Sequence, residues 1–237
     1  MSGTLFVVTT PIGNLEDLTF RAVRTLGELD VLACEDTRQT RKIFTRYEIT
    51  SPRQIFSYHE HNAQQAGKQI LEYLQQGLSV GLCSDAGSPG ISDPGYKIIS
   101  DSIEHGFALE IIPGPSAVTT ALVLSGLSTA SYTFKGFSPP KSGQRKKFIA
   151  RDGDAPHTLV FFESPYRINK FLQDAHEVLG DRKAAVCVEL TKKFERVHRG
   201  FLGELVEQFQ SGKIKGEITV VIAGNHPKFI RPSSSVL

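Results

Sequence analysis

Short apolar runs alternate with amphipathic segments along the first half of the chain. Apolar, often β-branched runs predict strands at 4–9, 31–34, 54–57, 79–83 and 108–112. Apolar side chains at helical spacing between these runs predict helices at 17–29, 63–75 and 96–105. Two parallel strands need a long crossover between them, and a helix usually supplies it. The pattern therefore predicts an α/β fold with a largely parallel sheet.

The second half of the chain repeats this alternation less regularly. Its apolar runs predict strands at 132–137, 157–162, 184–190 and 218–223. Its helical patterns lie at 117–124, 144–150, 167–179 and 203–210. A Pro-Gly-Pro turn at 113–117 separates the two halves. We therefore predict an N-terminal α/β domain at 1–112, a hinge at 113–117 and a C-terminal α/β domain at 118–237.

The composition is that of an ordinary globular protein, with 40% hydrophobic and 22% charged residues. No apolar run approaches the roughly 20 residues of a membrane-spanning helix, so we expect no membrane association. The first apolar run has no basic leader, and we interpret it as a strand rather than a signal peptide. Cys34, Cys83 and Cys187 lie in apolar runs, which indicates buried free thiols in a reducing compartment. We expect a cytoplasmic protein.

The formal net charge of +2 conceals a difference between the two halves. Up to Ala117 there are 9 basic and 14 acidic residues, whereas from Val118 onward there are 18 basic and 11 acidic residues. A basic half is typical of a surface that meets an anionic partner. The C-terminal half is therefore the first place to look for contacts with such a partner.

Three turns that follow predicted strands are candidates for a binding cleft: 9–14, 84–95 and 113–117. In open α/β sheets, ligands bind beyond the carboxyl ends of the strands, and Gly and Pro allow the backbone to approach them closely. Any one of these turns alone would be ordinary, but the three together favour a cleft. No G-x-G-x-x-G motif follows the first strand and no P-loop motif occurs, which disfavours dinucleotide dehydrogenases and P-loop NTPases. A ligand held through backbone contacts, such as an adenosyl group with an amino-acid tail, fits better.

Other chemistries find little support in the sequence. His59 and His61 would share a face of a strand, but no third ligand accompanies them, so we expect no metal site. No G-x-S-x-G motif indicates a nucleophilic serine. A nucleotide hydrolase would need a cluster of metal-binding carboxylates, and the sequence assembles none.

The segment 132–151 interleaves basic and aromatic residues. Its cations are Lys135, Lys141, Arg145, Lys146, Lys147 and Arg151, and its rings are Tyr132, Phe134, Phe137 and Phe148. Cations neutralise phosphates and exposed rings stack on unpaired bases, so the segment is a candidate RNA contact. The alternative interpretation is a solvated helix face with aromatic residues in the core, and the sequence leaves both open. A second basic edge is formed by Arg38, Arg41, Lys42 and Arg46.

At these same segments the chain resembles the tetrapyrrole-methylase superfamily. The matching segments are Thr10-Pro-Ile-Gly-Asn-Leu15, Glu35-Asp-Thr-Arg38, Ser84-Asp-Ala-Gly-Ser-Pro89, Ile91-Ser-Asp-Pro-Gly95, Ile112-Pro-Gly-Pro-Ser-Ala117, Gly136-Phe-Ser-Pro-Pro-Lys141, Glu163-Ser-Pro-Tyr-Arg167, Glu189-Leu-Thr-Lys192 and Lys215-Gly-Glu217. Within the superfamily, the chain is most similar to the enzymes that methylate the 2′-hydroxyl of a cytidine in the decoding region of 16S ribosomal RNA. The resemblance covers almost the whole chain in order, which makes it more specific than any single motif.

The resemblance implies two α/β domains, usually in a homodimer, with S-adenosylmethionine in a cleft between the domains. The cofactor-binding residues that it implies are Pro11, Asp85, Gly87, Ser88, Ser116, Ala117, Phe162, Leu190, Glu217 and Thr219. Among these, Asp85, Gly87 and Ser88 are expected at the amino-acid end of the cofactor. The implied substrate is 16S rRNA in the small ribosomal subunit.

A ribose hydroxyl is a poor nucleophile, so a general base is expected to help the transfer. We hypothesise that Glu35, Asp36 or Glu163 takes or orients the hydroxyl proton. The residues expected to contact the RNA are Arg38, Lys141, Arg145, Lys146, Lys147, Arg167 and Lys192. For each carboxylate, the alternative is a helix cap or an ion pair.

Two other functions remain open. A tetrapyrrole (precorrin-type) methyltransferase or a diphthine synthase would share the cofactor cleft, although the basic aromatic segment favours RNA over a corrinoid. A non-catalytic RNA-binding module would retain the basic surface and bind no S-adenosylmethionine. Equilibrium binding of the cofactor separates these two classes.

Overall fold

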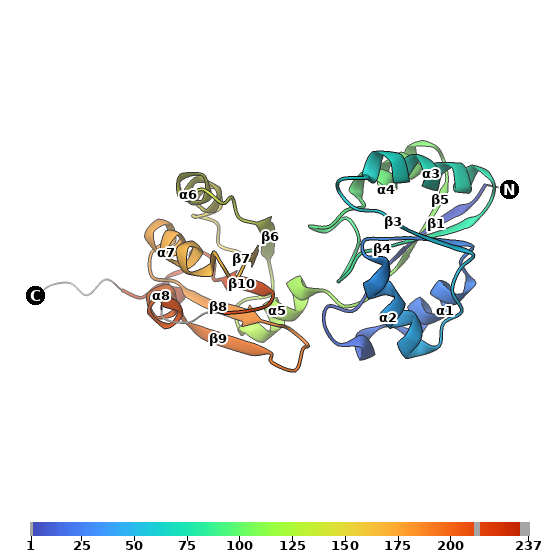
Figure 1. Ribbon diagram of the computed structural model, residues 1–237. Helices are drawn as coiled ribbons and strands as arrows, with labels where there is room; N and C mark the ends of the chain where they lie inside the picture. The colour runs from blue at the N-terminus through green and yellow to red at the C-terminus, as the bar shows by residue number, and fades with distance from the viewer. Residues whose placement is uncertain (1, 211–213, 233–237) are drawn as a thin grey trace, which may run out of the picture. The chain divides into compact units, whose positions relative to one another are not determined.

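The computed structural model describes residues 2–210 and 214–232, and the chain divides into two compact units (Figure 1). The N-terminal unit is Met1–Ser116 and the C-terminal unit is Ala117–Leu237. The division falls inside the segment 113–117 that we expected to join two domains. Each unit has a five-stranded sheet and a core of its own.

The N-terminal unit contains a parallel sheet, as the sequence predicts. Its strands are β1 (Thr4–Val8), β2 (Val31–Cys34), β3 (Gln54–Ser57), β4 (Ser79–Cys83) and β5 (Ala108–Ile112). They lie in the order β3-β2-β4-β1-β5, and each neighbouring pair is parallel. The carboxyl ends of β1, β4 and β5 therefore meet at one edge of the sheet, where the three predicted turns follow them.

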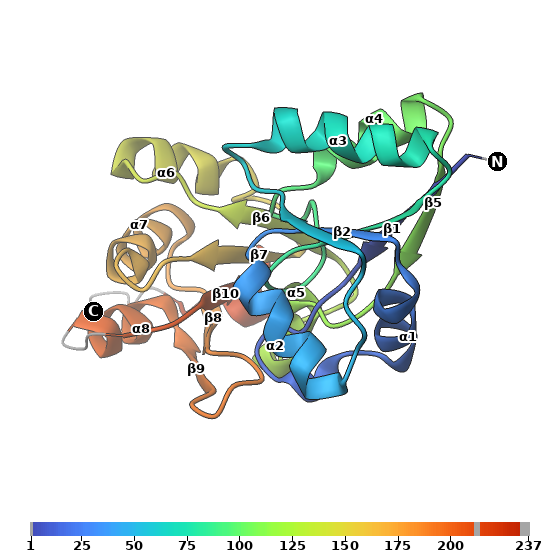
Figure 2. The same cartoon turned by 45° about the vertical axis from the view of Figure 1, so that its right-hand side comes forward.

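Helices cover both faces of this sheet (Figures 1 and 2). Leu5 and Val7 of β1 belong to the core under α3 (Ala63–Gln75) and α4 (Tyr96–Glu104). Val8 belongs to the core under α1 (Phe20–Glu28) and α2 (Thr37–Tyr47). Alternate side chains of a strand point to opposite faces, so one apolar run supplies both cores.

Two features of this unit differ from the sequence prediction. A short 3-10 helix, Leu15–Asp17, precedes α1. Helix α1 itself begins only at Phe20, because the Thr19 side chain caps it by accepting a hydrogen bond from the Ala22 N–H. The predicted helix at 17–29 is therefore divided. Helix α2 is missed entirely, since only Thr40, Ile43 and Phe44 are buried along its eleven residues.

The C-terminal sheet is mixed. Its strands are β6 (Tyr132–Phe137), β7 (Thr158–Glu163), β8 (Lys183–Val188), β9 (Arg196–Phe201) and β10 (Ile218–Ile222), in the order β6-β7-β10-β8-β9. Only β6 and β7 pair in parallel; the other three pairs are antiparallel. The largely parallel arrangement that the sequence predicts for the first half is therefore not repeated in this half, which is still an α/β domain. The turn 189–195 is too short for a crossover, so β8 and β9 form a hairpin.

Helices pack on both faces of the second sheet as well. Helices α6 (Ser142–Ala150), α7 (Ile168–Leu179) and α8 (Leu202–Gln210) share one core with the sheet, and α5 (Ala117–Ser125) packs against β8 and β10 from the other side. Strand β9 was not predicted, because its sequence RVHRGF is polar and partly exposed at an edge of the sheet. Within residues 2–210 and 214–232, no helix has both the length and the apolar character needed to cross a bilayer.

Candidate functional site

Two of the predicted turns are bound together at the carboxyl edge of the N-terminal sheet. Thr10 and Gly87 form an isolated bridge, with Thr10 N donating to Gly87 O at 2.9 Å and Gly87 N donating to Thr10 O at 3.1 Å. The Thr10 hydroxyl also donates to the carbonyl of Ser84 at 3.0 Å, and the hydroxyls of Thr9 and Ser88 lie 3.0 Å apart. These contacts link the turn after β1 to the long loop after β4.

The third predicted turn reaches the same place. A Cβ atom at Gly114 would lie 3.0 Å from both Cβ and Cγ2 of Thr9, so a larger residue would crowd Thr9 and glycine lets the turn after β5 approach β1 closely. Pro11, predicted to line the cofactor site, is buried, whereas Ser88 is partly exposed. The three turns that the sequence singles out therefore converge on Thr9 and Thr10.

A group of three carboxylates lies beside these turns, at the ends of the neighbouring strands β2 and β4. The backbone N–H of Asp36 donates to Asp85 Oδ1 at 3.0 Å, and that of Asp85 donates to Glu35 Oε2 at 3.2 Å. Partial desolvation raises the pKa of Asp85, and the charges of Glu35 and Asp36 add to this effect. This edge of the sheet is therefore rich in acceptors and negative charge, which suits a cationic ligand.

Asp36 begins helix α2 as its N-cap. Its Oδ1 accepts a hydrogen bond from Arg38 N at 2.8 Å, and its Oδ2 accepts one from the Arg38 guanidinium at 2.6 Å. These hydrogen bonds, of which the guanidinium contributes most, lower the pKa of Asp36 to about 2. A carboxylate with so low a pKa is a weak base at neutral pH, so the structure favours a capping role for Asp36 over a catalytic one.

The low pKa of Asp36 leads to a prediction for acid stability. The folded state favours the ionised carboxylate, because the pKa falls from 3.8 to about 2 on folding. The stabilisation is therefore complete above pH 3.8 and is lost as the pH falls to about 2. Asp36→Asn keeps a capping oxygen and should remove this part of the pH dependence, as measured by urea unfolding across this range. A carboxyl NMR titration of Asp36 with its midpoint at the ordinary value would contradict the prediction.

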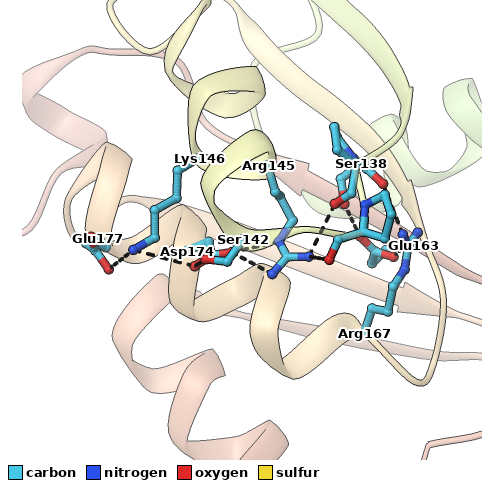
Figure 3. A network of polar contacts seen from close by, with 10 residues as sticks. Ser138, Ser142, Arg145, Lys146, Glu163, Arg167, Asp174 and Glu177 are labelled. Atoms are coloured by element: carbon cyan, nitrogen blue, oxygen red, sulfur yellow. Dashed lines mark hydrogen bonds and ion pairs between the residues drawn. The ribbon is translucent and has the colours of Figure 1, made fainter.

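Glu163, the third predicted catalytic carboxylate, is 2% exposed in the C-terminal unit. Its side chain accepts hydrogen bonds from the Ser138 hydroxyl and from Ser164 N, and it forms an ion pair of 2.7 Å with Arg167 (Figure 3). Arg167 in turn donates to the carbonyl of Ser138 at 3.1 Å. This carboxylate joins the ends of β6 and β7 to the start of α7. Its position favours a structural role, which leaves Glu35 as the best placed of the three candidates.

The turn after β8 has a strained backbone. Glu189 and Thr191 adopt positive φ values of 54° and 62°, which are uncommon for residues other than glycine. Leu190 between them is 6% exposed, so its side chain is anchored in the core. Strain of this kind is concentrated at functional sites because the surrounding structure must hold it in place.

A lysine is held beside this turn by two carboxylates. Lys192 Nζ lies 2.8 Å from Glu189 Oε1 and 3.0 Å from Glu217 Oε2, and Glu217 N donates to Glu189 Oε1 at 2.9 Å. Burial alone would lower the pKa of Lys192, but the two carboxylates outweigh it and raise the pKa. Lys192 therefore stays protonated, and its ammonium is held in place between the two carboxylates. Glu189 was not among the predicted residues, since nothing in the sequence reveals its positive φ.

The other predicted cofactor residues of the C-terminal unit lie on its sheet and at its start. Phe162 packs between Phe134 and Phe137, with ring centroids 4.8 and 5.6 Å away. Thr219, its register partner on β10, is 4% exposed. Ser116 and Ala117 lie on the two sides of the boundary between the units. Their contacts with a cofactor remain predictions.

Arg145 does not belong to an RNA-binding surface, although the sequence suggested that it does. It is 1% exposed, and its guanidinium bonds to Asp174 at 2.7 Å and to the carbonyls of Pro139 and Pro140 (Figure 3). The predicted RNA contact is therefore wrong, because the helix buries this side chain instead of presenting it. Phe148 likewise packs against the core. The alternative interpretation, a solvated helix face with aromatics in the core, is correct for Phe148 but not for Arg145, which is buried.

The remaining cations of the segment are accessible to different degrees. Lys141 and Lys147 are exposed, and Lys146 is half-buried in an ion pair of 2.6 Å with Glu177. In the N-terminal unit, the basic edge that the sequence suggested is one face of helix α2. Residues at a spacing of three or four share a helix face, and the exposed cations at this spacing are Arg38, Arg41, Lys42 and Arg46.

The structure also bears on the cysteines and histidines. Cys34, Cys83 and Cys187 are free and buried, which confirms that prediction. The rings of His59 and His61 lie with their centroids 6.0 Å apart. Across residues 2–210 and 214–232, no group of three or more His, Cys, Asp or Glu side chains is placed to hold a metal ion.

Comparisons with known proteins identify the relatives of this chain. A family model described as "Tetrapyrrole (Corrin/Porphyrin) Methylases" matches residues 4–206. The ribosomal RNA small subunit methyltransferase I of Halalkalibacterium halodurans is 46% identical over 95% of this chain and 78% of its own length. The protein of the same name from Thermotoga maritima is 40% identical over 94% of this chain and 99% of its own length.

Solved structures with the same fold have low sequence identity. A diphthine synthase covers 94% of this chain and 90% of its own with a TM-score of 0.69 and 14% identity. The uroporphyrin-III C-methyltransferase of Thermus thermophilus, in complex with S-adenyl homocysteine, covers 93% of this chain and 97% of its own with a TM-score of 0.65 and 17% identity. At these identities the likeness shows the two-domain α/β fold.

Proposed function

Because the chain belongs to the tetrapyrrole (corrin/porphyrin) methylase family, we propose that it methylates the 2′-hydroxyl of a cytidine in 16S ribosomal RNA with S-adenosylmethionine as the methyl donor. The observation that carries this proposal is the 46% identity, over 95% of the chain, to a relative named ribosomal RNA small subunit methyltransferase I. The basic surface of helix α2 supports an anionic substrate.

The residues at the carboxyl edge of the N-terminal sheet fit the cofactor. S-adenosylmethionine has a positively charged sulfonium and an ammonium group, and both are favoured near carboxylates. Glu35, Asp36 and Asp85 provide this negative charge, and the turns that converge on Thr9 and Thr10 provide main-chain groups. In the proposal, Asp85, Gly87 and Ser88 bind the amino-acid end. Phe162, Leu190, Glu217 and Thr219 are proposed to contact the rest of the cofactor.

When bound, the cofactor supplies a methyl group that is already activated on sulfur. The chain must therefore place and deprotonate a ribose hydroxyl, and positioning alone contributes up to about 7–11 kcal/mol in the best cases. We assign proton acceptance to Glu35, whose Oε2 accepts only the Asp85 N–H among the described contacts. Arg167 and Lys192 are proposed to bind flanking phosphates, and Arg38, Lys141, Lys146 and Lys147 to extend this contact. A homodimer that acts in the cytoplasm on the small ribosomal subunit completes the proposal.

The decisive experiment is a transfer assay with tritium-labelled S-adenosylmethionine. Small subunits from cells that lack the enzyme are incubated with the purified protein, and the modified nucleoside is mapped by mass spectrometry. The expected result is label in a 2′-O-methylcytidine of 16S rRNA. Calorimetry of S-adenosylmethionine binding is the parallel measurement, since a non-catalytic RNA-binding module would take up none. Label in an added tetrapyrrole, but not in RNA, would replace this proposal with the tetrapyrrole alternative.

The basic face of helix α2 gives a prediction about salt dependence. Arg41 and Lys42 are exposed neighbours on this face. The double substitution of both residues by Gln should weaken binding to 16S rRNA and reduce the slope of log affinity against log salt by about 1.4–1.8, because each lost phosphate contact removes about 0.7–0.9. Fluorescence titrations at several salt concentrations measure this slope. Gln substitution of Lys68, an exposed lysine on α3, should leave the slope unchanged. An unaltered slope in the double variant would remove α2 from the RNA-binding surface.

A further inference from the structure

Two aromatic side chains are exposed in the turns after β7 and β8. Tyr166 is 94% exposed and Phe194 is 65% exposed. Aromatic side chains usually bury about 150–250 Å² each, so two rings left in solvent on one unit indicate a surface that binds something. Neither ring lies in the basic aromatic segment that the sequence singled out.

The two turns lie at the same edge of the C-terminal sheet. Strands β7 and β8 are both antiparallel to β10, which lies between them, so they run in the same direction and end at one edge. Neighbouring strands are about 4.8 Å apart, which places the starts of the two turns about 10 Å apart. Successive bases of a stacked strand rise about 3.4 Å, so this separation corresponds to about three nucleotides.

Both rings are carried by turns with a well-defined main chain. Tyr166 N donates to the Ser164 hydroxyl at 3.2 Å, and Arg167 N donates to the Ser164 carbonyl at 2.9 Å. In the other turn, Thr191 N donates to Glu195 Oε2 at 2.7 Å. A ring that is uncovered on a fixed main chain is pre-organised, so binding costs little conformational entropy.

Positively charged side chains lie near both rings, but neighbouring carboxylates neutralise their charge. Arg167 follows Tyr166 and is paired with Glu163, and Lys193 Nζ lies 5.7 Å from the ring centroid of Phe194. Glu195 lies in the same turn as Phe194. Because the local charge is nearly neutral, attraction of phosphates alone does not account for this surface. The rings themselves are its distinctive feature, and unpaired bases are the part of an RNA that stacks on rings.

We propose that Tyr166 and Phe194 stack on unpaired bases of the RNA that flank the modified nucleotide. This inference rests on the proposed function and specifies its substrate further: the bound segment is single-stranded where it crosses the edge of the C-terminal sheet. Base stacking on an aromatic side chain tolerates any sequence, so the two rings fix the path of the strand, while the phosphate contacts of Arg167 and Lys192 fix its register.

The test uses leucine substitutions, because leucine keeps the apolar bulk and lacks the aromatic face. Tyr166→Leu and Phe194→Leu should each weaken binding to a fluorescein-labelled single-stranded RNA from the decoding region by about tenfold. The salt slope of binding should stay as in the wild type, because no phosphate contact is lost. Tyr166→Phe should bind like the wild type. Thermal unfolding should be unchanged in all variants, since both rings are exposed.

Phe20→Leu is the matched control, since Phe20 is 95% exposed on α1 of the other unit, and it should bind RNA like the wild type. Wild-type affinity in both Tyr166→Leu and Phe194→Leu, or an equal loss in Phe20→Leu, would overturn the stacking proposal. The labelled-methyl assay is run on the same preparations. If the leucine variants bind the RNA about tenfold more weakly than the wild type, stacking holds whether or not methyl is transferred. The absence of transfer by the wild type counts against the proposed function alone.

Discussion

Replacing Arg145 with alanine is expected to lower the free energy of unfolding of the C-terminal unit by about 3–5 kcal/mol. Arg145 and Asp174 form a buried ion pair at 2.6 Å between α6 and α7, and the two side chains are 1% and 9% exposed. Removing the guanidinium leaves the Asp174 carboxylate buried with a single neighbouring hydroxyl, that of Ser142, and a more distant Lys146. It also removes the donors that bind the carbonyls of Pro139 and Pro140.

Urea unfolding, followed by circular dichroism, measures this loss. Lys146→Ala is the control, because the neighbouring lysine is also basic and paired, but its pair with Glu177 lies at the surface and should contribute little. Arg145→Met combined with Asp174→Leu should recover most of the stability, since it removes both charges together. A change of under about 1 kcal/mol for Arg145→Ala would show that the buried pair is not what joins α6 to α7.

Gly216→Ala is expected to reduce the rate of methyl transfer at subsaturating RNA by about ten- to a hundredfold. Gly216 has φ +97°, and a Cβ atom there would lie 2.2 Å from Cδ of Glu189. The Glu189 carboxylate must then move away from Lys192 Nζ and Glu217 N, to which it now bonds. Charge-assisted hydrogen bonds contribute about 1.5–3 kcal/mol each, and about 1.4 kcal/mol corresponds to a factor of ten in rate.

The control variant Gly180→Ala distinguishes the steric clash with Glu189 from the backbone strain of alanine at a positive φ. Gly180 also has a positive φ, of 74°, in the same unit, but a Cβ atom there would meet nothing within 4 Å. Both variants should lose stability because alanine disfavours a positive φ, by about 1–3 kcal/mol. Only Gly216→Ala should lose transfer activity when both are assayed well below their melting temperatures. Equal activity in the two variants would mean that the position of Lys192 does not matter to the reaction.

The sequence predicted those elements whose local pattern and tertiary environment agree. Helix α3 was predicted at its observed bounds, because its apolar positions form one regular stripe that ends before a glycine. The parallel direction of the strands in the N-terminal sheet was predicted from the alternation of strands and helices. Helix α2 was missed, since it buries only three side chains and its remaining surface is charged. Its capping aspartate, Asp36, was hypothesised to be a catalytic base, with a helix cap as the alternative.

The sequence-based prediction of the candidate site has the same limits. The turns at 9–14, 84–95 and 113–117 were identified because Gly and Pro after a strand are visible in the sequence, and the structure brings them together. Periodicity does not reveal whether a charged residue in a helix faces water or a buried partner, and Arg145 was therefore misinterpreted. The positive φ of Glu189 occurs where its main chain and side chain hydrogen-bond to Glu217, 28 residues away, and has no sequence signal. Pairing partners also decide strand direction, which is why the antiparallel pairs of the second sheet were not foreseen.

The polar sequence of β9 that hid this strand also has a consequence in solution. Strand β9 is an edge of its sheet, and an open edge offers its unpaired main-chain groups to the strand of another molecule. Arg196 and Arg199 are exposed along it, and the Arg199 side chain bends to the carbonyl of Leu124. An edge-to-edge pairing of two identical strands would bring four such cations into one ladder, where like charges repel. The edge is therefore protected against self-aggregation by the residues that make it difficult to recognise.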